Sequence, residues 1–223
     1  MESSSGTERE TLKAMYRLSP GGDAVRTGDL AEALGVSPGT VTARLKRFDE
    51  RALAEHRPYQ GVRLTAAGRR LAVSAIRRHR IVERFLSDML GYPWDGADRL
   101  AVTFEHNLPD EVVQRLFIAL HRPTSCPHGF PIPSDEADEV VQLPTLADVT
   151  TGDEVEVAVP GTTDPEIVAF LDTLGIRPGA RVTVRDHQPF DGPLVVSVDD
   201  EERLIGSNLA RAIFVSAVTR EAM

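Results

Sequence analysis

Cysteine is nearly absent from this sequence, since Cys126 is the single one among 223 residues. One thiol excludes an intrachain disulfide, so Cys126 is a buried small side chain, a reactive thiol or a metal ligand. The chain also lacks a run of about 18 apolar residues, the length that a membrane-spanning helix needs. Its N-terminus lacks the apolar stretch of a signal peptide, so we expect a cytoplasmic protein with no membrane partner.

Catalytic motifs are missing as well. No stretch of the sequence sets a general base beside a nucleophile or beside activated water, so we expect neither an enzyme nor a small organic substrate. What is present is the composition of a folded protein, with 41% hydrophobic and 26% charged residues. The length suits two or three small domains with buried cores.

The net charge of −9 is distributed unevenly along the chain. Residues 1–75 carry 12 basic and 9 acidic side chains, residues 76–133 carry 7 of each, and residues 134–223 carry 6 basic and 18 acidic ones. The acidity therefore belongs to the C-terminal third. A basic N-terminal unit can approach phosphate, and its binding to DNA should weaken steeply with salt.

The N-terminal residues have the pattern of a helix-turn-helix. Apolar residues at helical spacing predict a first helix from about Thr7, where Thr7 and Glu10 have the spacing of a capping box. A short second helix ends at Gly35, and Ser37 is a good N-cap for a third helix that begins at Pro38. Two short helices joined by a tight turn fit the DNA-binding motif.

The third helix offers hydroxyl and basic side chains suited to base edges and phosphates. Strands near 53–56 and 62–64 add a hairpin wing. The alternative is a small helical bundle whose basic residues are only solvated. If the unit binds DNA, one helix reads few base pairs, so we expect a dimer on a pseudo-palindromic operator. The predicted DNA-contacting residues are Thr27, Ser37, Pro38, Gly39, Thr40, Thr42, Arg44, Arg47, Arg57 and Tyr59.

Three further helices are predicted over 65–90, 93–107 and 109–120, with apolar faces that suit a dimer interface or, alternatively, the core of a monomer. They also carry residues that can bind metal. His79 and Glu83 share one helix face, although Glu83 could instead pair with a neighbouring arginine. Glu105 and His106 could be a polar helix end. Cys126 and His128 could chelate one ion, or Cys126 could be a buried turn residue.

Together these stretches resemble a known family. The resemblance is carried by Leu64-Thr65-Ala-Ala-Gly68, Arg78-His79-Arg80-Ile81-Val82-Glu83-Arg84, Glu105-His106, Pro109-Asp-Glu111 and Gly129-Phe-Pro-Ile-Pro133. The chain resembles the diphtheria toxin repressor family of metal-dependent transcriptional regulators, which has iron-responsive and manganese-responsive branches. Its ligand pattern is most similar to that of the manganese-responsive members.

The resemblance implies an α+β multidomain fold. A winged helix-turn-helix DNA-binding domain would span residues 1–75, and an all-helical metal-binding and dimerisation domain would span residues 76–140. A C-terminal SH3-like small β-barrel of the FeoA type would follow over 141–223. Short strands expected near 153–159, 181–186, 194–199 and 212–218, with a helix from 165 to 174, fit that barrel.

The resemblance also implies two metal sites. The ligands of the principal site would be His79, Glu83, Cys126, His128 and Asp164. Asp164 comes from the barrel; it could instead be a helix N-cap, and Glu166 is a neighbouring alternative. The second site would use Glu10, Glu105 and His106. It should be weak, because Val102 stands where the family usually has a cysteine or glutamate ligand, and Glu10 also fits the capping box.

Metal choice follows from the ligands. The carboxylate of Glu10 suits manganese, whereas the thiolate of Cys126 would accept softer ions. We expect Mn(II) or Fe(II), with other divalent transition metals able to substitute in vitro. Asp98 stands where some iron-responsive members have a histidine ligand, and it could replace that ligand or be a solvated surface residue.

The function that the resemblance implies is a metal-activated repressor of metal homeostasis. A bound cation would connect elements of separate domains and favour the dimer that fits its operator. The alternative from another class is a winged-helix redox regulator that senses oxidation through Cys126. A metalloenzyme is disfavoured, because its ligands would be dispersed among three units.

Overall fold

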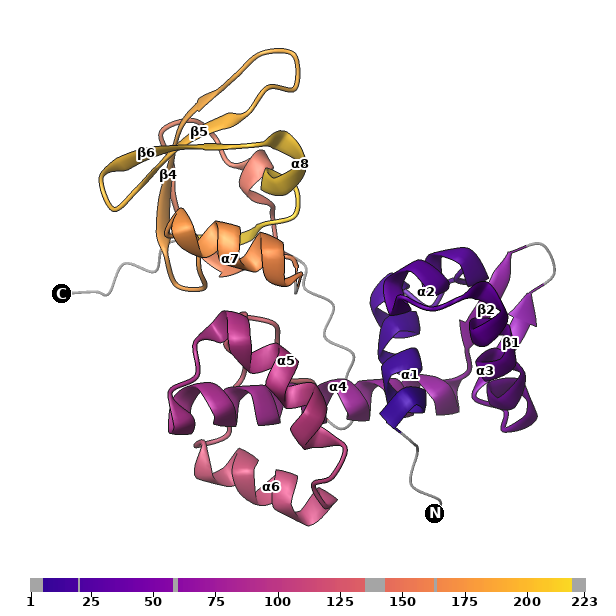
Figure 1. Cartoon of the computed structure of the whole chain (residues 1–223). Helices are drawn as coiled ribbons and strands as arrows, with labels where there is room; N and C mark the ends of the chain where they lie inside the picture. The colour runs from indigo at the N-terminus through magenta and orange to yellow at the C-terminus, as the bar shows by residue number, and fades with distance from the viewer. Residues whose placement is uncertain (1–5, 20, 58–59, 135–142, 163, 218–223) are drawn as a thin grey trace.

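The computed structural model describes residues 6–19, 21–57, 60–134, 143–162 and 164–217, which form three units along the chain (Figure 1). The winged helix-turn-helix unit lies apart from the C-terminal sheet unit, and a long helix extends from the first unit into a helical domain (Figure 1). The expected α+β multidomain fold is confirmed. No helix among the described residues is long and apolar enough to cross a membrane.

The winged unit has five elements. They are α1 (Gly6–Leu18), α2 (Thr27–Leu34), α3 (Pro38–Glu50), β1 (Ala54–Arg57) and β2 (Gly61–Leu64). Gly35 ends α2 in the left-handed conformation, and the Ser37 hydroxyl accepts a hydrogen bond from the Thr40 backbone N–H at 3.2 Å. Both predicted helix boundaries are therefore confirmed. The core beneath them includes Leu12, Met15, Leu30, Val41, Leu45 and Phe48.

The start of α1 differs from the prediction. Thr7 already lies inside the helix, where its carbonyl accepts a hydrogen bond from the Thr11 hydroxyl at 2.8 Å. The expected capping box does not describe Glu10, because the Glu10 carboxylate faces Lys13 one helical turn further on. A tertiary ion pair has taken the side chain that local spacing assigned to a helix cap.

The helical domain is built on α4 (Ala66–Leu90), with α5 (Trp94–Glu105) and α6 (Asp110–Ala119) packed on it. The Thr65 hydroxyl caps α4 by accepting from the Gly68 backbone N–H at 3.1 Å, and Gly91 ends the helix in the left-handed conformation. Helix α4 also packs on α1 of the winged unit. The boundary predicted near residue 75 falls inside this continuous helix.

The C-terminal unit is an antiparallel sheet with strand order β6-β5-β4-β3-β7. Its strands are β3 (Glu154–Val159), β4 (Arg181–His187), β5 (Leu194–Val198), β6 (Glu201–Ile205) and β7 (Phe214–Ala217). Helix α7 (Pro165–Thr173), the short α8 (Ser207–Ala210) and a 3-10 turn at Leu146–Asp148 accompany them. The Trp94 indole N–H donates to Asp172 at 3.0 Å, which joins α5 of the helical domain to α7 of this unit.

Candidate metal centre

Three groups of potential metal ligands assemble in the part of the chain that the structure describes. Within each group the ligand atoms lie within 4.8 Å of one another. The groups are Glu83 with Cys126 and His128, His79 with Glu83 and Asp98, and Glu10 with Glu105 and His106. Residues far apart in the sequence thus meet around two helices, α4 and α5.

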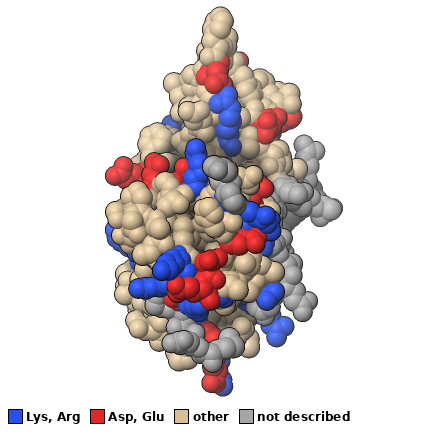
Figure 2. Space-filling view, turned by 90° about the vertical axis from the view of Figure 1, so that its right-hand side faces the viewer, with Lys and Arg blue, Asp and Glu red and all other residues tan. Residues whose placement is uncertain are grey.

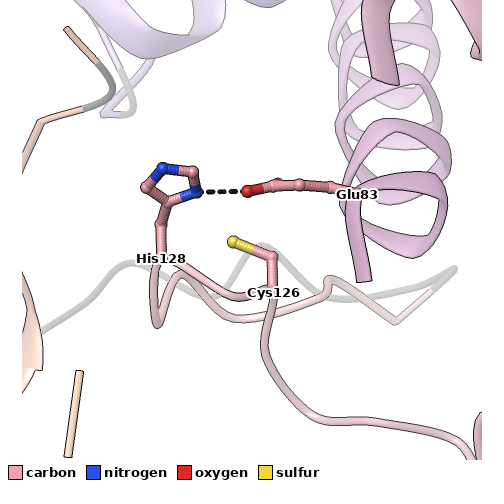
Figure 3. A group of neighbouring side chains, drawn as sticks. All are labelled: Glu83, Cys126 and His128. Atoms are coloured by element: carbon pink, nitrogen blue, oxygen red, sulfur yellow. Dashed lines mark hydrogen bonds and ion pairs between the residues drawn. The ribbon is translucent and has the colours of Figure 1, made fainter. Parts of the chain in front are cut away.

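The first group joins α4 to the loop after α6 (Figure 3). The Glu83 carboxylate points from α4 toward the His128 ring, and the Cys126 thiol lies beside both (Figure 3). His128 Nδ1 and Glu83 Oε1 share a hydrogen bond. All three residues are at least 98% buried. A carboxylate, an imidazole and a thiol enclosed in this way are a donor set that fits a divalent transition metal.

The loop that carries Cys126 and His128 is held by its own backbone and by the sheet unit. The Cys126 N–H donates to the Phe130 carbonyl, and the Gly129 N–H donates to the Cys126 carbonyl, both at 2.9 Å. Gly129 has a φ of +79°, and a Cβ there would lie 1.9 Å from the Ala158 carbonyl oxygen of β3. Only glycine therefore lets this turn pack so closely on the sheet.

Burial and the neighbouring Glu83 carboxylate raise the pKa of the Cys126 thiol well above its usual range. A thiol in this state is a poor nucleophile, because oxidation and disulfide exchange both start from the thiolate. A metal cation would reverse the preference, since metal ligation requires the thiolate. The surroundings of Cys126 therefore do not favour a freely reactive thiol.

His79 lies between two carboxylates. Its Nδ1 is 2.8 Å from Glu105 Oε2 and its Nε2 is 2.9 Å from Asp98 Oδ1, with Glu83 Oε2 at 4.0 Å. Burial alone would lower the pKa of His79, but the hydrogen bonds to Asp98 and Glu105 raise it above its ordinary value. Asp98 is half-buried and hydrogen-bonded to His79, so the solvated surface role considered for it does not describe its contacts.

The second predicted site brings Glu10, Glu105 and His106 together, as expected. An unexpected side chain lies between the two acids: the Lys13 ammonium is 2.7 Å from Glu10 Oε1 and 2.8 Å from Glu105 Oε1. Burial opposes ionisation of Glu105, but the His79 ring and Lys13 outweigh it and lower the pKa of Glu105 to about 2. This group already contains the Lys13 ammonium, so it fits a metal ion less well than the group of Glu83, Cys126 and His128 does.

The predicted barrel ligand lies elsewhere. Asp164 is exposed and caps α7, where its carboxylate accepts from the Glu166 N–H at 2.9 Å and the Ile167 N–H at 3.3 Å. Neither Asp164 nor Glu166 belongs to a group of potential ligands in the described residues. The structure does not bring them to the Glu83 group, because the cap holds Asp164 at the start of its own helix.

Most of the predicted DNA-contacting residues lie on the outer side of α3. Exposed on this side are Ser37, Pro38, Gly39, Thr40, Thr42 and Arg47, and Thr27 is half-buried. Arg44 is turned inward, since its guanidinium donates to the Thr11 hydroxyl at 3.2 Å. Arg57 forms an ion pair with Glu55 at 2.8 Å, and Tyr59 lies outside the described residues. On the face seen in Figure 2, basic and acidic side chains are interspersed.

Sequence reasoning missed two buried cations at the junction of the domains. Lys13 was not singled out, although it follows Glu10 by three residues on one helix face and so could neutralise it. Arg78 donates to the Glu105 carbonyl at 2.7 Å and to Asp110 at 2.5 Å. No local signal distinguishes Arg78 from the other arginines around it, because both of its partners lie on other elements.

Three family models match consecutive parts of the chain. The N-terminal DNA binding domain of iron dependent repressors matches residues 5–62, and their metal binding and dimerisation domain matches residues 65–134. The FeoA domain matches residues 145–217. The order of these matches is the order of the three structural units.

Relatives of known identity match over nearly their whole length. The iron-dependent repressor IdeR of Mycobacterium tuberculosis is 30% identical over 220 residues, which cover 93% of this chain and 95% of IdeR. The diphtheria toxin repressor of Corynebacterium diphtheriae is 28% identical, with 91% of this chain and 93% of the repressor covered. A manganese-dependent transcriptional repressor solved with manganese has a TM-score of 0.84 at 32% identity, with 95% of this chain and 100% of that one covered.

A winged helix-turn-helix, a helical domain with a buried ligand group and an SH3-like sheet define the class of metal-dependent transcriptional repressors. The chain belongs to the iron-dependent repressor family, of which the diphtheria toxin repressor is a member. The protein is therefore a metal-dependent regulator of metal homeostasis and not an enzyme. These relatives give no support to redox sensing through Cys126.

Proposed function

We propose that this protein binds a pseudo-palindromic operator as a homodimer when Mn(II) or Fe(II) is held by Glu83, Cys126 and His128. The observation that carries the proposal is the burial of this carboxylate, thiol and imidazole within 4.8 Å of one another. His79 is the fourth ligand that we propose, because its ring nitrogen lies 4.0 Å from the other oxygen of Glu83. The sensor is thus built on the dimerisation helices.

The choice of metal rests on the donor set and on the relatives. Related proteins are named for iron and for manganese, and solved relatives carry manganese, zinc or cadmium. A mixed set of oxygen, nitrogen and sulfur donors accepts all of these ions, so selectivity has to come from geometry and cellular supply. The carboxylate of Glu10 no longer argues for manganese, because it is paired with Lys13.

The residues of the metal centre can couple metal binding to the position of the DNA-binding unit. When bound, the cation supplies positive charge that holds a carboxylate, a thiolate and an imidazole together. Cys126 would hold the ion as a thiolate, after loss of its thiol proton, and Glu83 and His128 would hold it through a carboxylate oxygen and a ring nitrogen. Glu83 lies on α4, which also packs on α1, so a changed position of Glu83 reaches the winged unit through one continuous helix. Couplings of this kind change DNA affinity roughly 5- to 150-fold.

The homodimer that we propose uses the helical domain, and residues 1–75, 76–140 and 141–223 keep the roles predicted for them. Large apolar side chains remain exposed at the end of α4 and on α5 and α6, where water contact is unfavourable. They are Met89, Leu90, Tyr92, Phe104, Val112 and Ile118. A repressor acts where its operator is, so the proposal also places the protein in the cytoplasm.

The test compares DNA binding with and without metal. Purified full-length protein is mixed with a labelled pool of random-sequence duplexes in chelator, in Mn(II), and in Fe(II) without oxygen, and bound DNA is recovered over several rounds. We expect enrichment of a palindromic sequence in at least one metal and none in chelator. Glu83→Gln should abolish the enrichment, whereas Glu111→Gln, at an exposed glutamate of α6, should preserve it. Equal enrichment in chelator and metal would refute the proposal.

A further inference from the structure

A lysine is buried where the winged unit meets the helical domain. Lys13 lies on α1 and is 99% buried, and its ammonium lies within 2.8 Å of one oxygen each from Glu10 and Glu105. A buried ammonium is stable only when opposite charges surround it. The same two carboxylate oxygens are the ones that a metal ion in this group would need.

We propose that Lys13 is the resident cation of the Glu10–Glu105–His106 group, which makes this group a metal-independent clamp between α1 and α5. The inference rests on the proposed function in one respect: it leaves metal sensing to the centre around Glu83. The clamp joins a DNA-binding helix to the dimerisation helices through Lys13 and Glu105, which are 92 positions apart in the sequence. Metal-free protein would therefore keep α1 docked.

Charge and ligand supply both oppose a metal ion in the clamp. A divalent cation near the ammonium would meet strong repulsion, because the interior screens charge far less than water does. Val102 contributes no donor atom. To make room, the ammonium would have to leave its two carboxylates, and a buried charge without partners is strongly destabilising.

His106, the third member of the group, could complete a metal site if the ammonium were absent. His106 Nε2 lies 3.9 Å from Glu10 Oε1, and His106 Nδ1 is buried without a hydrogen-bond partner, 4.0 Å from Glu105 Oε1. Without the ammonium, two carboxylates and one imidazole would face a common position. Removal of Lys13 should therefore convert the clamp into a metal site.

The clamp is also connected to the proposed metal centre through hydrogen bonds and close contacts. One carboxylate oxygen of Glu105 accepts a hydrogen bond from Lys13, and the other oxygen lies 2.8 Å from His79 Nδ1. His79 in turn faces Asp98 and Glu83. Lys13 is thus also a positioning residue. It orients the Glu105 carboxylate, which in turn holds the ring of His79, a proposed metal ligand.

The first experiment counts Mn²⁺ bound to the full chain by equilibrium dialysis. In Glu10→Gln we expect the number of bound ions to equal that of the wild type, because Glu10 pairs with the ammonium and not with metal. Glu10 is partly exposed and its amide analogue keeps an acceptor oxygen, so this variant should fold. Loss of a bound ion in Glu10→Gln would overturn the inference. Glu111→Gln is the matched exposed control.

The second experiment looks for a gain of metal. In a Glu83→Gln background, where the proposed sensor is disabled, Lys13→Met should bind one additional Mn²⁺ per chain, and Mn²⁺ should raise its thermal unfolding temperature. A Lys13→Met variant that is folded by circular dichroism and binds no additional ion would overturn the inference. If it does not fold, the Glu10→Gln result decides.

The two proposals fail in different ways. Unchanged Mn²⁺ binding in Glu83→Gln alone would refute the assignment of the sensor and would leave the clamp intact. Reduced Mn²⁺ binding in Glu10→Gln alone would refute the clamp and would leave the sensor intact.

Discussion

The buried pair of Lys13 and Glu105 should show strong energetic coupling in metal-free protein. Both side chains are about 1% exposed, so solvent does not screen their interaction. Removing one partner of a buried ion pair typically costs about 3 to 5 kcal/mol, because the other charge stays buried. We expect Lys13→Met and Glu105→Gln each to lower the free energy of unfolding within that range.

The double variant should lose less than the sum of the two single losses, because neither Lys13 nor Glu105 is then left buried opposite a neutral side chain. Contacting residues usually couple by about 0.5 to 3 kcal/mol, and full burial places this pair near the upper end. Urea unfolding in chelator, followed by circular dichroism and by the fluorescence of Trp94, measures the four free energies. Trp94 is the single tryptophan and lies at the start of α5, with its ring centroid 5.1 Å from that of His128.

A matched cycle on Arg115 and Glu111 serves as the control, because this ion pair has the same distance class but is more than 70% exposed on α6. Its coupling should be about 0.3 to 0.5 kcal/mol. If the Lys13 and Glu105 losses added to within about 0.5 kcal/mol, the buried pair would not interact as described and the reasoning would be refuted.

Three further results are expected. In chelator, the wild type should have a higher free energy of unfolding than Glu105→Gln above pH 4.5, and this difference should fade toward pH 2. The reason is that folding lowers the pKa of Glu105 from 4.5 to about 2. This interval corresponds to about 3 kcal/mol, measurable by urea unfolding across the acid range, and a lead independent of pH would contradict it. Gly129→Ala should weaken Mn²⁺ binding and lower the unfolding temperature, because its Cβ would meet the Ala158 carbonyl; Gly96→Ala, with only an ordinary contact at 3.8 Å, should do neither. Asp164→Asn should change neither Mn²⁺ affinity nor stability, since asparagine caps helices equally well, and a drop in affinity by dialysis would instead make Asp164 a ligand.

Local signals in the sequence were sufficient for most helix boundaries. Gly35 and Gly91 end their helices in the left-handed conformation, and Ser37 and Thr65 begin theirs with side-chain caps. These features depend on a few adjacent residues, so the sequence displays them directly. Strand β6 was missed because Glu201–Ile205 is largely polar and exposed, as is usual for a strand at the edge of a sheet.

The ligand groups were predictable only in part. From its resemblance to a known family, the sequence predicted Glu83, Cys126 and His128 as metal ligands. The fold brings these three residues together. The role of Lys13 could not be predicted, because its partner Glu105 lies on another element and the helix pattern around Lys13 says nothing about that distance. Asp164 illustrates the opposite case, in which a local cap that the sequence does display explains the side chain better than the distant site does.

Helix α4 spans 25 residues without a break and runs between the winged unit and the helical domain (Figure 1). At about 1.5 Å per residue it is a rod of roughly 38 Å, and each residue turns its direction by about 100°. The angle between the DNA-reading unit and the Glu83 side chain is therefore fixed by the number of residues between them. One residue inserted before Glu83 would turn the DNA-reading unit by about 100° relative to the Glu83 group while leaving every ligand in the sequence. The number of residues along α4 therefore sets how the metal centre is oriented relative to the DNA-reading unit.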